Sequence, residues 1–259
     1  MINRLYELGD FWVFVIFGSI AVLCFMIAPS IGALLRWTAP TKERADYVLR
    51  AQVTVISFTA IILAFSLVQV QTNLRKTEEL VAKEAGQIDF LDRQLLRYGD
   101  PKVADLRTLL WDYTNAILQD EWPGLKYGIE SVRTEQAVRP LTRAVFAIEP
   151  QTARQTAIYN ELLKSMDQLA ESRDQRISAA QLSLPTEFWY LAAALFVIMI
   201  GLSLMIEPEP HQNVSIAAQG LAIVLLAALV FVIDHPFIGS FAVQPTALEQ
   251  TFTVMRART

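Results

Sequence analysis

The polar side chains best placed to act on a solute lie in one apolar segment and its continuation. Gln52, Thr59, Ser66 and Asn73 recur every seven residues, so on a helix they form one stripe. Polar groups in hydrocarbon are costly unless they face protein or water. The stripe therefore predicts either hydrogen bonds between membrane helices or one wall of a water-filled path.

Three apolar side chains run beside this stripe. Phe58, Ile62 and Phe65 have the spacing i, i+4, i+7, which places them on one helical face. A ring of such side chains resists wetting in a narrow pore, so we expect any constriction here, flanked by Thr59 and Ser66. Four membrane helices enclose no roomy pore, so a path requires several subunits around an axis.

A second polar group follows the last apolar segment: Asp234 and His235, then Pro236 and Phe237. One interpretation is a C-terminal turn in which Asp234 accepts backbone N–H groups and Pro236 ends the helix. The other is an acidic ring at the membrane mouth of assembled subunits. The sequence leaves both open.

Enzymatic and metal chemistry find no support in the residue types. The chain has 2 His and 1 Cys, too few for a Cys/His metal cluster, and it lacks phosphate-loop, hydrolase and zinc-protease motifs. We therefore expect no catalytic residue, no metal site and no cofactor. The net charge of −4, without a Lys/Arg-rich cluster, argues against a nucleic-acid partner.

Four apolar segments must position these groups. Each is long enough for a helix to cross ~30 Å of hydrocarbon, and none contains Asp, Glu, Lys or Arg. They span residues 11–35, 51–70, 188–206 and 214–233. The chain is therefore expected to be a multi-pass protein of the lipid bilayer.

The polar middle, residues 71–187, has a helical pattern. The second span is expected to continue as one helix to Arg97, because Leu74, Val81, Ile88 and Leu95 recur at sevens. Asp100 and Pro101 then begin a new helix. Further expectations are a turn at 121–124, a helix at 132–148 kinked or split by Pro140, and a helix that opens at 149–150 and runs to about 181.

The expected fold class is all-α: a four-span membrane protein whose long helices continue into an antiparallel helical soluble domain. The divisions are 1–70, 71–187, 188–233 and 234–259. The last division holds a turn and a short amphipathic helix from near Pro245, which either lies at the membrane interface or packs under the bundle.

Orientation follows from the charge count. Four spans place both ends and the middle domain on one side, and that side has more Lys and Arg near the membrane than the opposite loops. The positive-inside rule then places the domain in the cytoplasm.

Several short stretches carry a family resemblance together. They are Leu91-Asp92-Arg93 with Tyr98-Gly99, Glu121-Trp122-Pro123, Leu184-Pro185 with Phe188-Trp189, and Asp234-His235-Pro236-Phe237-Ile238-Gly239. The chain resembles bacterial bestrophin-like membrane proteins of unknown function, which are distantly similar to bestrophin anion channels.

The resemblance implies a pentameric assembly, small anions as the transported solute, and an apolar neck on the second membrane helix. Phe58, Ile62 and Phe65 are the positions most like that neck. The acidic cluster with which animal bestrophins bind calcium has no counterpart here, so calcium gating is not implied. The leading hypothesis is a homo-oligomeric anion channel in the bacterial cytoplasmic membrane. The alternative is a non-conducting scaffold or sensor whose helical domain binds a partner.

Overall fold

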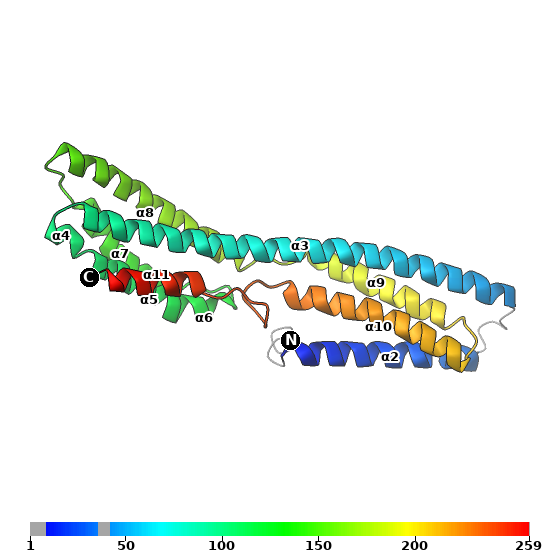
Figure 1. Ribbon diagram of the computed structural model, residues 1–259. Coiled ribbons are helices and arrows are strands. Elements are labelled where there is room, and N and C mark those ends of the chain that lie inside the picture. Colours follow the sequence, from blue (N-terminus) through cyan, green and yellow to red (C-terminus); the bar gives the residue numbers. More distant parts are fainter. Residues whose placement is uncertain (1–8, 36–41, 259) are drawn as a thin grey trace. The chain divides into compact units, whose positions relative to one another are not determined.

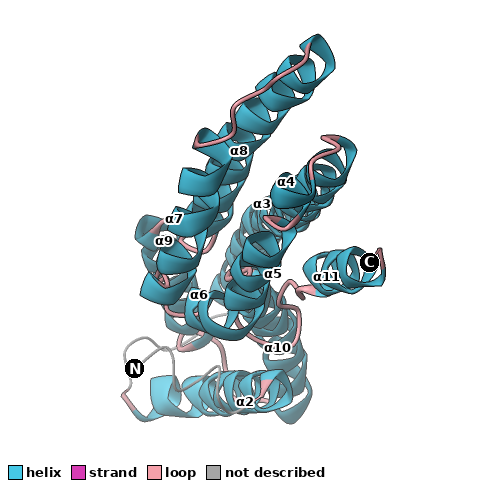
Figure 2. Cartoon of the chain, turned by 90° about the vertical axis from the view of Figure 1, so that its left-hand side faces the viewer, coloured by secondary structure: helices cyan, strands magenta, loops and turns pink. Residues whose placement is uncertain are grey.

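The computed structural model describes residues 9–35 and 42–258. Every regular element in these ranges is helical, as Figures 1 and 2 show. The chain forms two compact units. Unit 1 comprises residues up to 72, 183–235 and 239–241, and unit 2 comprises 73–182, 236–238 and 242–259. The helix α3 (Lys42–Arg97) is 56 residues long and belongs to both.

Unit 1 contains the membrane helices. Among the described residues, four helices are long and apolar enough to span a bilayer: α2 (Asp10–Leu34), the first part of α3, α9 (Thr186–Ser203) and α10 (Pro210–Ile233). The expected four-span, all-α fold class is thereby confirmed, with each helix starting up to nine residues before the apolar segment that predicted it. Residues outside the apolar segments, such as Lys42 and Pro210, begin these helices ahead of their hydrocarbon-matched stretches.

Glycines allow the helices of unit 1 to approach closely. A Cβ at Gly32 of α2 would lie 1.8 Å from the carbonyl oxygen of Leu204, just past α9. A Cβ at Gly220 of α10 would lie 2.1 Å from the ring of Phe25. Phe25 itself is fully buried and packs edge-on against Phe196 at 5.4 Å between ring centroids. Small residues at such contacts let membrane helices gain close packing where no hydrophobic driving force exists between them.

Unit 2 is a helical bundle around the second part of α3. Its other helices are α4 (Pro101–Ala104), α5 (Arg107–Ala116), the π-helix η1 (Ile117–Glu121), α6 (Trp122–Leu125), α7 (Val132–Phe146), α8 (Ala153–Ala179) and α11 (Thr246–Ala257). The heptad residues Val81, Ile88 and Leu95 are buried in one core with Leu110, Leu162 and Met255. The predicted amphipathic face of α3 is therefore the face that packs.

Capping residues explain where these helices begin. The side chain of Asp100 accepts a hydrogen bond from the backbone of Lys102 at 2.9 Å, with Pro101 as the first helical residue, as the sequence predicted. The start of α8 was predicted three or four residues too early. Thr152, rather than Glu149 or Pro150, caps this helix through a 3.1 Å bond from the backbone of Gln155.

One further expectation was wrong, and one alternative of another is excluded. Residues 121–124 are not a turn, because the π-helix η1 runs directly into α6. Pro140 does not split its helix, since α7 is continuous from Val132 to Phe146. Pro140 and Gln136 are both exposed, so water can satisfy the Gln136 carbonyl that a proline at 140 leaves without a partner.

The structure also decides between the two positions considered for the last helix. Leu248 and Met255 of α11 are fully buried in the core of unit 2. The helix α11 packs against the bundle, not at the membrane interface, because its apolar face completes that core, while Glu249 and Arg256 on its other side are exposed.

Candidate functional site

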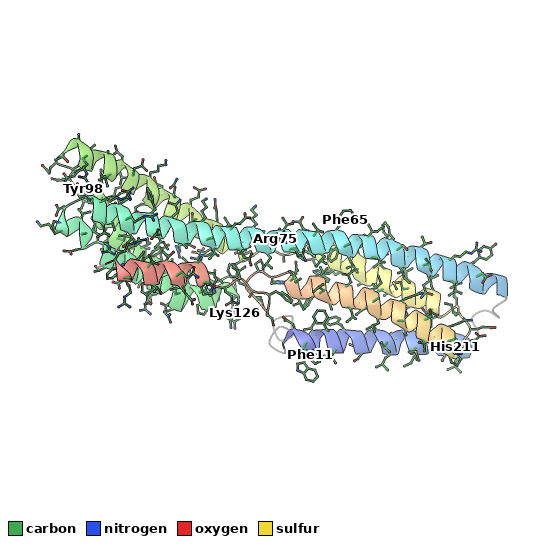
Figure 3. The ribbon with its side chains drawn as sticks, viewed as in Figure 1. Phe11, Phe65, Arg75, Tyr98, Lys126 and His211 are labelled. Atoms are coloured by element: carbon green, nitrogen blue, oxygen red, sulfur yellow. The ribbon has the colours of Figure 1, made fainter. Side chains whose placement is uncertain are left out.

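The apolar side chains predicted to form a constriction point away from the other helices of unit 1. Phe58 is 56% exposed and Phe65 is 73% exposed, whereas Ile62 is half-buried. Phe65 is labelled in Figure 3 on the outer side of α3. No other helix in the described part of the chain covers these rings, so they are available to lipid or to a second copy.

The polar stripe turns the other way. Gln52, Thr59 and Ser66 are buried inside unit 1, and Gln52 donates to the hydroxyl of Ser203 on α9 at 3.4 Å. The Thr59 and Ser66 hydroxyls donate to the carbonyls of Val55 and Ile62, one turn back on α3. Asn73, the fourth member, is half-buried and lies in unit 2. In this single chain Gln52 makes a hydrogen bond between membrane helices, one of the two possibilities the sequence left open, whereas the Thr59 and Ser66 bonds stay within α3.

Other polar groups occupy the outward face of α3. Thr54 and Ser57 are exposed before Phe58, and Gln69 and Thr72 are exposed after Phe65. The hydroxyls of Thr54, Ser57 and Thr72 each bond a carbonyl four residues back. Along this face, polar side chains thus precede and follow an apolar stretch. The seven-residue spacing does not reveal them, because they do not share one heptad position.

The group after the last span is divided between the units. Asp234 is buried in unit 1, where its carboxylate accepts the backbone N–H of Leu184 at 2.6 Å. His235 Nδ1 lies 3.9 Å from the same carboxylate. Burial raises the pKa of Asp234, although the Leu184 N–H, His235 and Trp189 oppose that rise.

Pro236 and Phe237, by contrast, belong to unit 2. The Pro236 carbonyl accepts the backbone N–H of Val243 at 2.8 Å. Phe237 packs edge-on against Trp122 with ring centroids 5.5 Å apart. Among the described residues, no group of three or more His, Cys, Asp or Glu could hold a metal ion.

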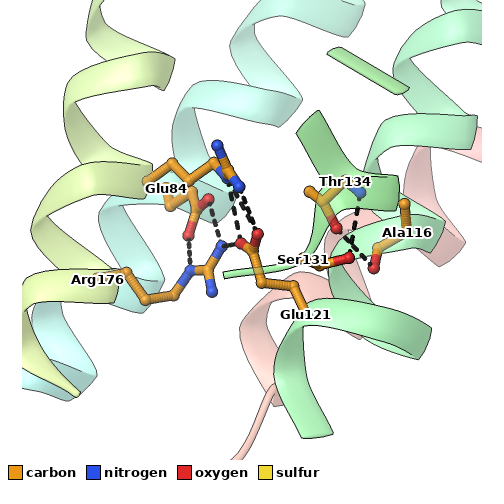
Figure 4. Close-up of polar contacts among 7 residues, drawn as sticks. Glu84, Ala116, Glu121, Ser131, Thr134 and Arg176 are labelled. Atoms are coloured by element: carbon orange, nitrogen blue, oxygen red, sulfur yellow. Dashed lines mark hydrogen bonds and ion pairs between the residues drawn. The ribbon is translucent and has the colours of Figure 1, made fainter. Parts of the chain in front are cut away.

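Sequence reasoning missed a buried ion-pair network in unit 2, drawn in Figure 4. Arg176 of α8 is fully buried and binds Glu84 of α3 through two nitrogens, one of them 3.1 Å from Glu84 Oε1. The same guanidinium donates to Glu121 of η1 at 2.6 Å, and Arg173 binds the other Glu121 oxygen at 2.6 Å. The network joins three elements that are far apart in sequence.

The π-helix explains how Glu121 reaches this network. A π-turn holds one more residue than an α-turn and is frequent at functional positions. It lets η1 pass into α6 without a break while Glu121 is fully buried and faces Arg176. A motif containing Glu121-Trp122-Pro123 carried part of the family resemblance, and here its acidic residue is the centre of the network.

The family model described as a bestrophin-like domain matches residues 24–248. The chain belongs to the bestrophin-like family. A bacterial bestrophin homologue from Klebsiella pneumoniae has a TM-score of 0.69 at 13% identity, with 94% of this chain and 98% of that chain covered. A mutant of that homologue gives a TM-score of 0.67 at 13% identity over 94% and 98%.

A third crystal structure, of a protein described only as a membrane protein variant, has a TM-score of 0.64 at 11% identity over 92% and 98% of the two chains. At such identities the likeness shows the shared fold. Comparison with curated protein sequences gave no match. The bestrophin-like order of two spans, a helical unit and two spans is thus shared along nearly the whole chain.

A second buried cluster of the bestrophin-like chain ties the C-terminal segment to α3. Arg107 of α5 binds Asp92 at 2.7 Å and donates to the Met255 carbonyl at 2.8 Å. Arg258 lies 2.6 Å from Asp89 and 3.2 Å from Asp92. No sequence signal pairs residues separated by 148 to 169 positions, although Asp92 lies in one of the stretches that carried the resemblance.

The Glu121 network predicts an acid-sensitive stability. Burial raises the pKa of Glu121, but bonds and charges from Arg173 and Arg176 outweigh it, so the pKa lies below its ordinary value of 4.5. Stabilisation by a carboxylate with a lowered folded-state pKa is present above the unfolded-state pKa and is lost as pH falls through the folded value. Thermal unfolding between pH 7 and pH 3 should show a smaller loss of stability with acid for Glu121→Gln than for wild type. Parallel profiles would contradict this assignment.

Proposed function

We propose that this protein is a homo-oligomeric channel of the bacterial cytoplasmic membrane that passes small anions along a path lined by α3. The bestrophin-like family and fold support the proposal, since bestrophins are the anion channels that the sequence resembles. Pentamers are the expected assembly on the same ground. The helical unit 2 is expected on the cytoplasmic side, from the distribution of Lys and Arg.

The observation that carries the proposal is the outward face of α3. A helix face that meets only lipid should be apolar throughout its depth. This face instead shows Thr54 and Ser57, then Phe58, Ile62 and Phe65, then Gln69 and Thr72. Hydroxyl and amide groups at both ends with an apolar stretch between them fit a wet path that narrows at a dewetting constriction.

One chain provides only one side of such a path. In the described part of unit 1 the exposed face of α3 has no opposite wall, so copies of the chain around an axis are required to enclose it. About five helical turns beyond Phe58 and Phe65, the same face of α3 carries Lys76 and Lys83, and both are exposed. Glu79 lies between them on the same face and is also exposed, so these three residues give the face a net positive charge, which would favour anions.

Phe65→Ala is the test of this function. Truncation should widen and wet the constriction, so anion flux in reconstituted vesicles should rise above that of wild type. Because Phe65 is 73% exposed, its loss should leave the fold of the single chain intact. Tyr190→Ala is the matched control, since Tyr190 is an aromatic residue on the span α9 and is 71% exposed.

The control variant should conduct as wild type does. Equal flux from wild type, Phe65→Ala and protein-free vesicles would exclude the channel and leave the scaffold or sensor. A rise in both variants would show that a general loosening of the assembly, rather than a constriction at Phe65, is responsible.

A further inference from the structure

The loop between α6 and α7, together with the first residue of α7, exposes several apolar side chains in the polar unit 2. Tyr127 is 54% exposed, Ile129 60% and Val132 68%. Leu182, at the end of the same unit, is 37% exposed. The loop is not part of the ion-pair networks or of α3, so the proposed path does not account for it.

The backbone of this loop is held in one conformation. The N–H groups of Tyr127 and Ile129 both donate to the carbonyl of Gly124, at 2.9 and 3.3 Å. Gly128 has a φ of 65°, a left-handed conformation that glycine adopts without strain. Leu125, only 1% exposed, fixes the base of the loop in the interior. The exposed side chains are therefore presented outward by a braced turn.

Chain continuity limits how far this loop can lie from the start of the membrane helix α9. A Cβ at Gly128 would lie 3.9 Å from the Gln181 side chain. The membrane helix α9 begins at Thr186, and five residues of chain reach at most about 18 Å. Within unit 2, Lys126 and Tyr98 mark opposite ends in Figure 3. The loop is thus at the end of unit 2 from which the chain passes into its third span.

The composition of the loop fits the water–lipid boundary. Tyrosine is enriched there, and lysine side chains reach from apolar surroundings to the headgroups. The Lys126 ammonium lies 4.8 Å from the centre of the Tyr127 ring. Nearby charge is balanced, because Glu130 is acidic and Arg133 is paired with Asp120 at 3.0 Å. Insertion of apolar groups, rather than attraction to anionic lipid, should dominate.

We propose that residues 126–132 form a membrane-interface anchor. Tyr127 and Ile129 insert among the phospholipid headgroups beside the start of α9, and Lys126 contacts lipid phosphate. The occupant of this surface is the bilayer itself, and the loop continues the lipid boundary that the four spans establish. The anchor does not depend on ion conduction, so it can be tested apart from the channel.

The experiment uses full-length protein reconstituted in phosphatidylcholine vesicles. In a Cys24→Ala background, a fluorophore is attached to Ile129→Cys and, separately, to Phe146→Cys. Phe146 is a matched control, because it is likewise 60% exposed and ends α7, which starts at Val132 next to the loop. A small fraction of the lipid carries a nitroxide on its headgroup, which quenches nearby fluorophores.

We expect nitroxide lipid to quench the label at 129 several-fold more strongly than the label at 146. Adding Tyr127→Ser should reduce quenching at 129 while the melting temperature stays unchanged. Equal quenching at 129 and 146 would overturn the anchor. So would a label at 129 that is shielded from lipid and cross-links to its counterpart on a second copy, which would identify the loop as a subunit contact instead.

Discussion

Arg176→Met is expected to destabilise the protein by about 3–5 kcal/mol, the cost of removing one partner from a buried ion pair. The substitution keeps much of the side-chain volume but leaves the fully buried carboxylate of Glu84 without its cation. Glu121 retains Arg173, so Glu84 is the carboxylate that loses its cationic partner. For a chain of this size the melting temperature should fall by about 10 °C, measured by thermal unfolding of the purified full-length protein.

A double variant separates lost charge pairing from lost packing. In Arg176→Met/Glu84→Leu the orphaned carboxylate is gone, and much of the stability should return, because well-packed apolar residues can replace a buried ion pair at little cost. Arg139→Ala breaks the exposed pair with Glu135 and should change the melting temperature little. A double variant no more stable than Arg176→Met would show that the guanidinium acts mainly through packing.

Gly32→Ala is expected to disrupt unit 1 even though it adds only one methyl group. The new Cβ would stand 1.8 Å from the backbone oxygen of Leu204, and a backbone atom cannot rotate away as a side chain can. The helix α2 must then separate from the end of α9, at a cost of about 3 kcal/mol, the upper end for overpacking. Folded yield in detergent and the melting temperature should both fall.

Gly201→Ala is the matched control on the neighbouring helix. Nothing lies within 4 Å of a Cβ at Gly201, so alanine should be tolerated there and should favour the helix by about 0.5–1 kcal/mol. Comparable losses of folded yield and melting temperature in the two variants would mean that glycine is needed at both positions. The close approach at Gly32 would then not explain the loss.

Periodicity explains how much of this architecture the sequence predicts. Apolar length identifies the four spans, and the heptad at Val81, Ile88 and Leu95 identifies the buried face of α3, because both signals are local. The π-helix ending at Glu121 is not predicted, since its extra residue has no compositional signature. Pairing of Glu84 with Arg176 across 92 positions depends on tertiary packing, which no local pattern encodes.

The candidate path is likewise only partly predictable from the sequence. Spacing places Thr59 and Ser66 on one stripe and Phe58 with Phe65 on another. Spacing cannot tell which stripe meets the chain's own helices and which faces outward. The packing of α9 determines which stripe is buried, because its Ser203 accepts the hydrogen bond from Gln52. Thr54, Ser57, Gln69 and Thr72 become candidates only when the outward face is known.

The position of α11 in the core sets an order of events during biosynthesis. Leu248 and Met255 are made after all four spans, yet they are buried against residues of α3 and α5 made much earlier. Until they arrive, the core of unit 2 is open and Arg107 lacks its carbonyl partner at Met255. Closure of the soluble unit must therefore wait for synthesis of the fourth span. If synthesis stops before residue 248, unit 2 has an incomplete core. Its exposed apolar surface is then accessible to proteases and chaperones.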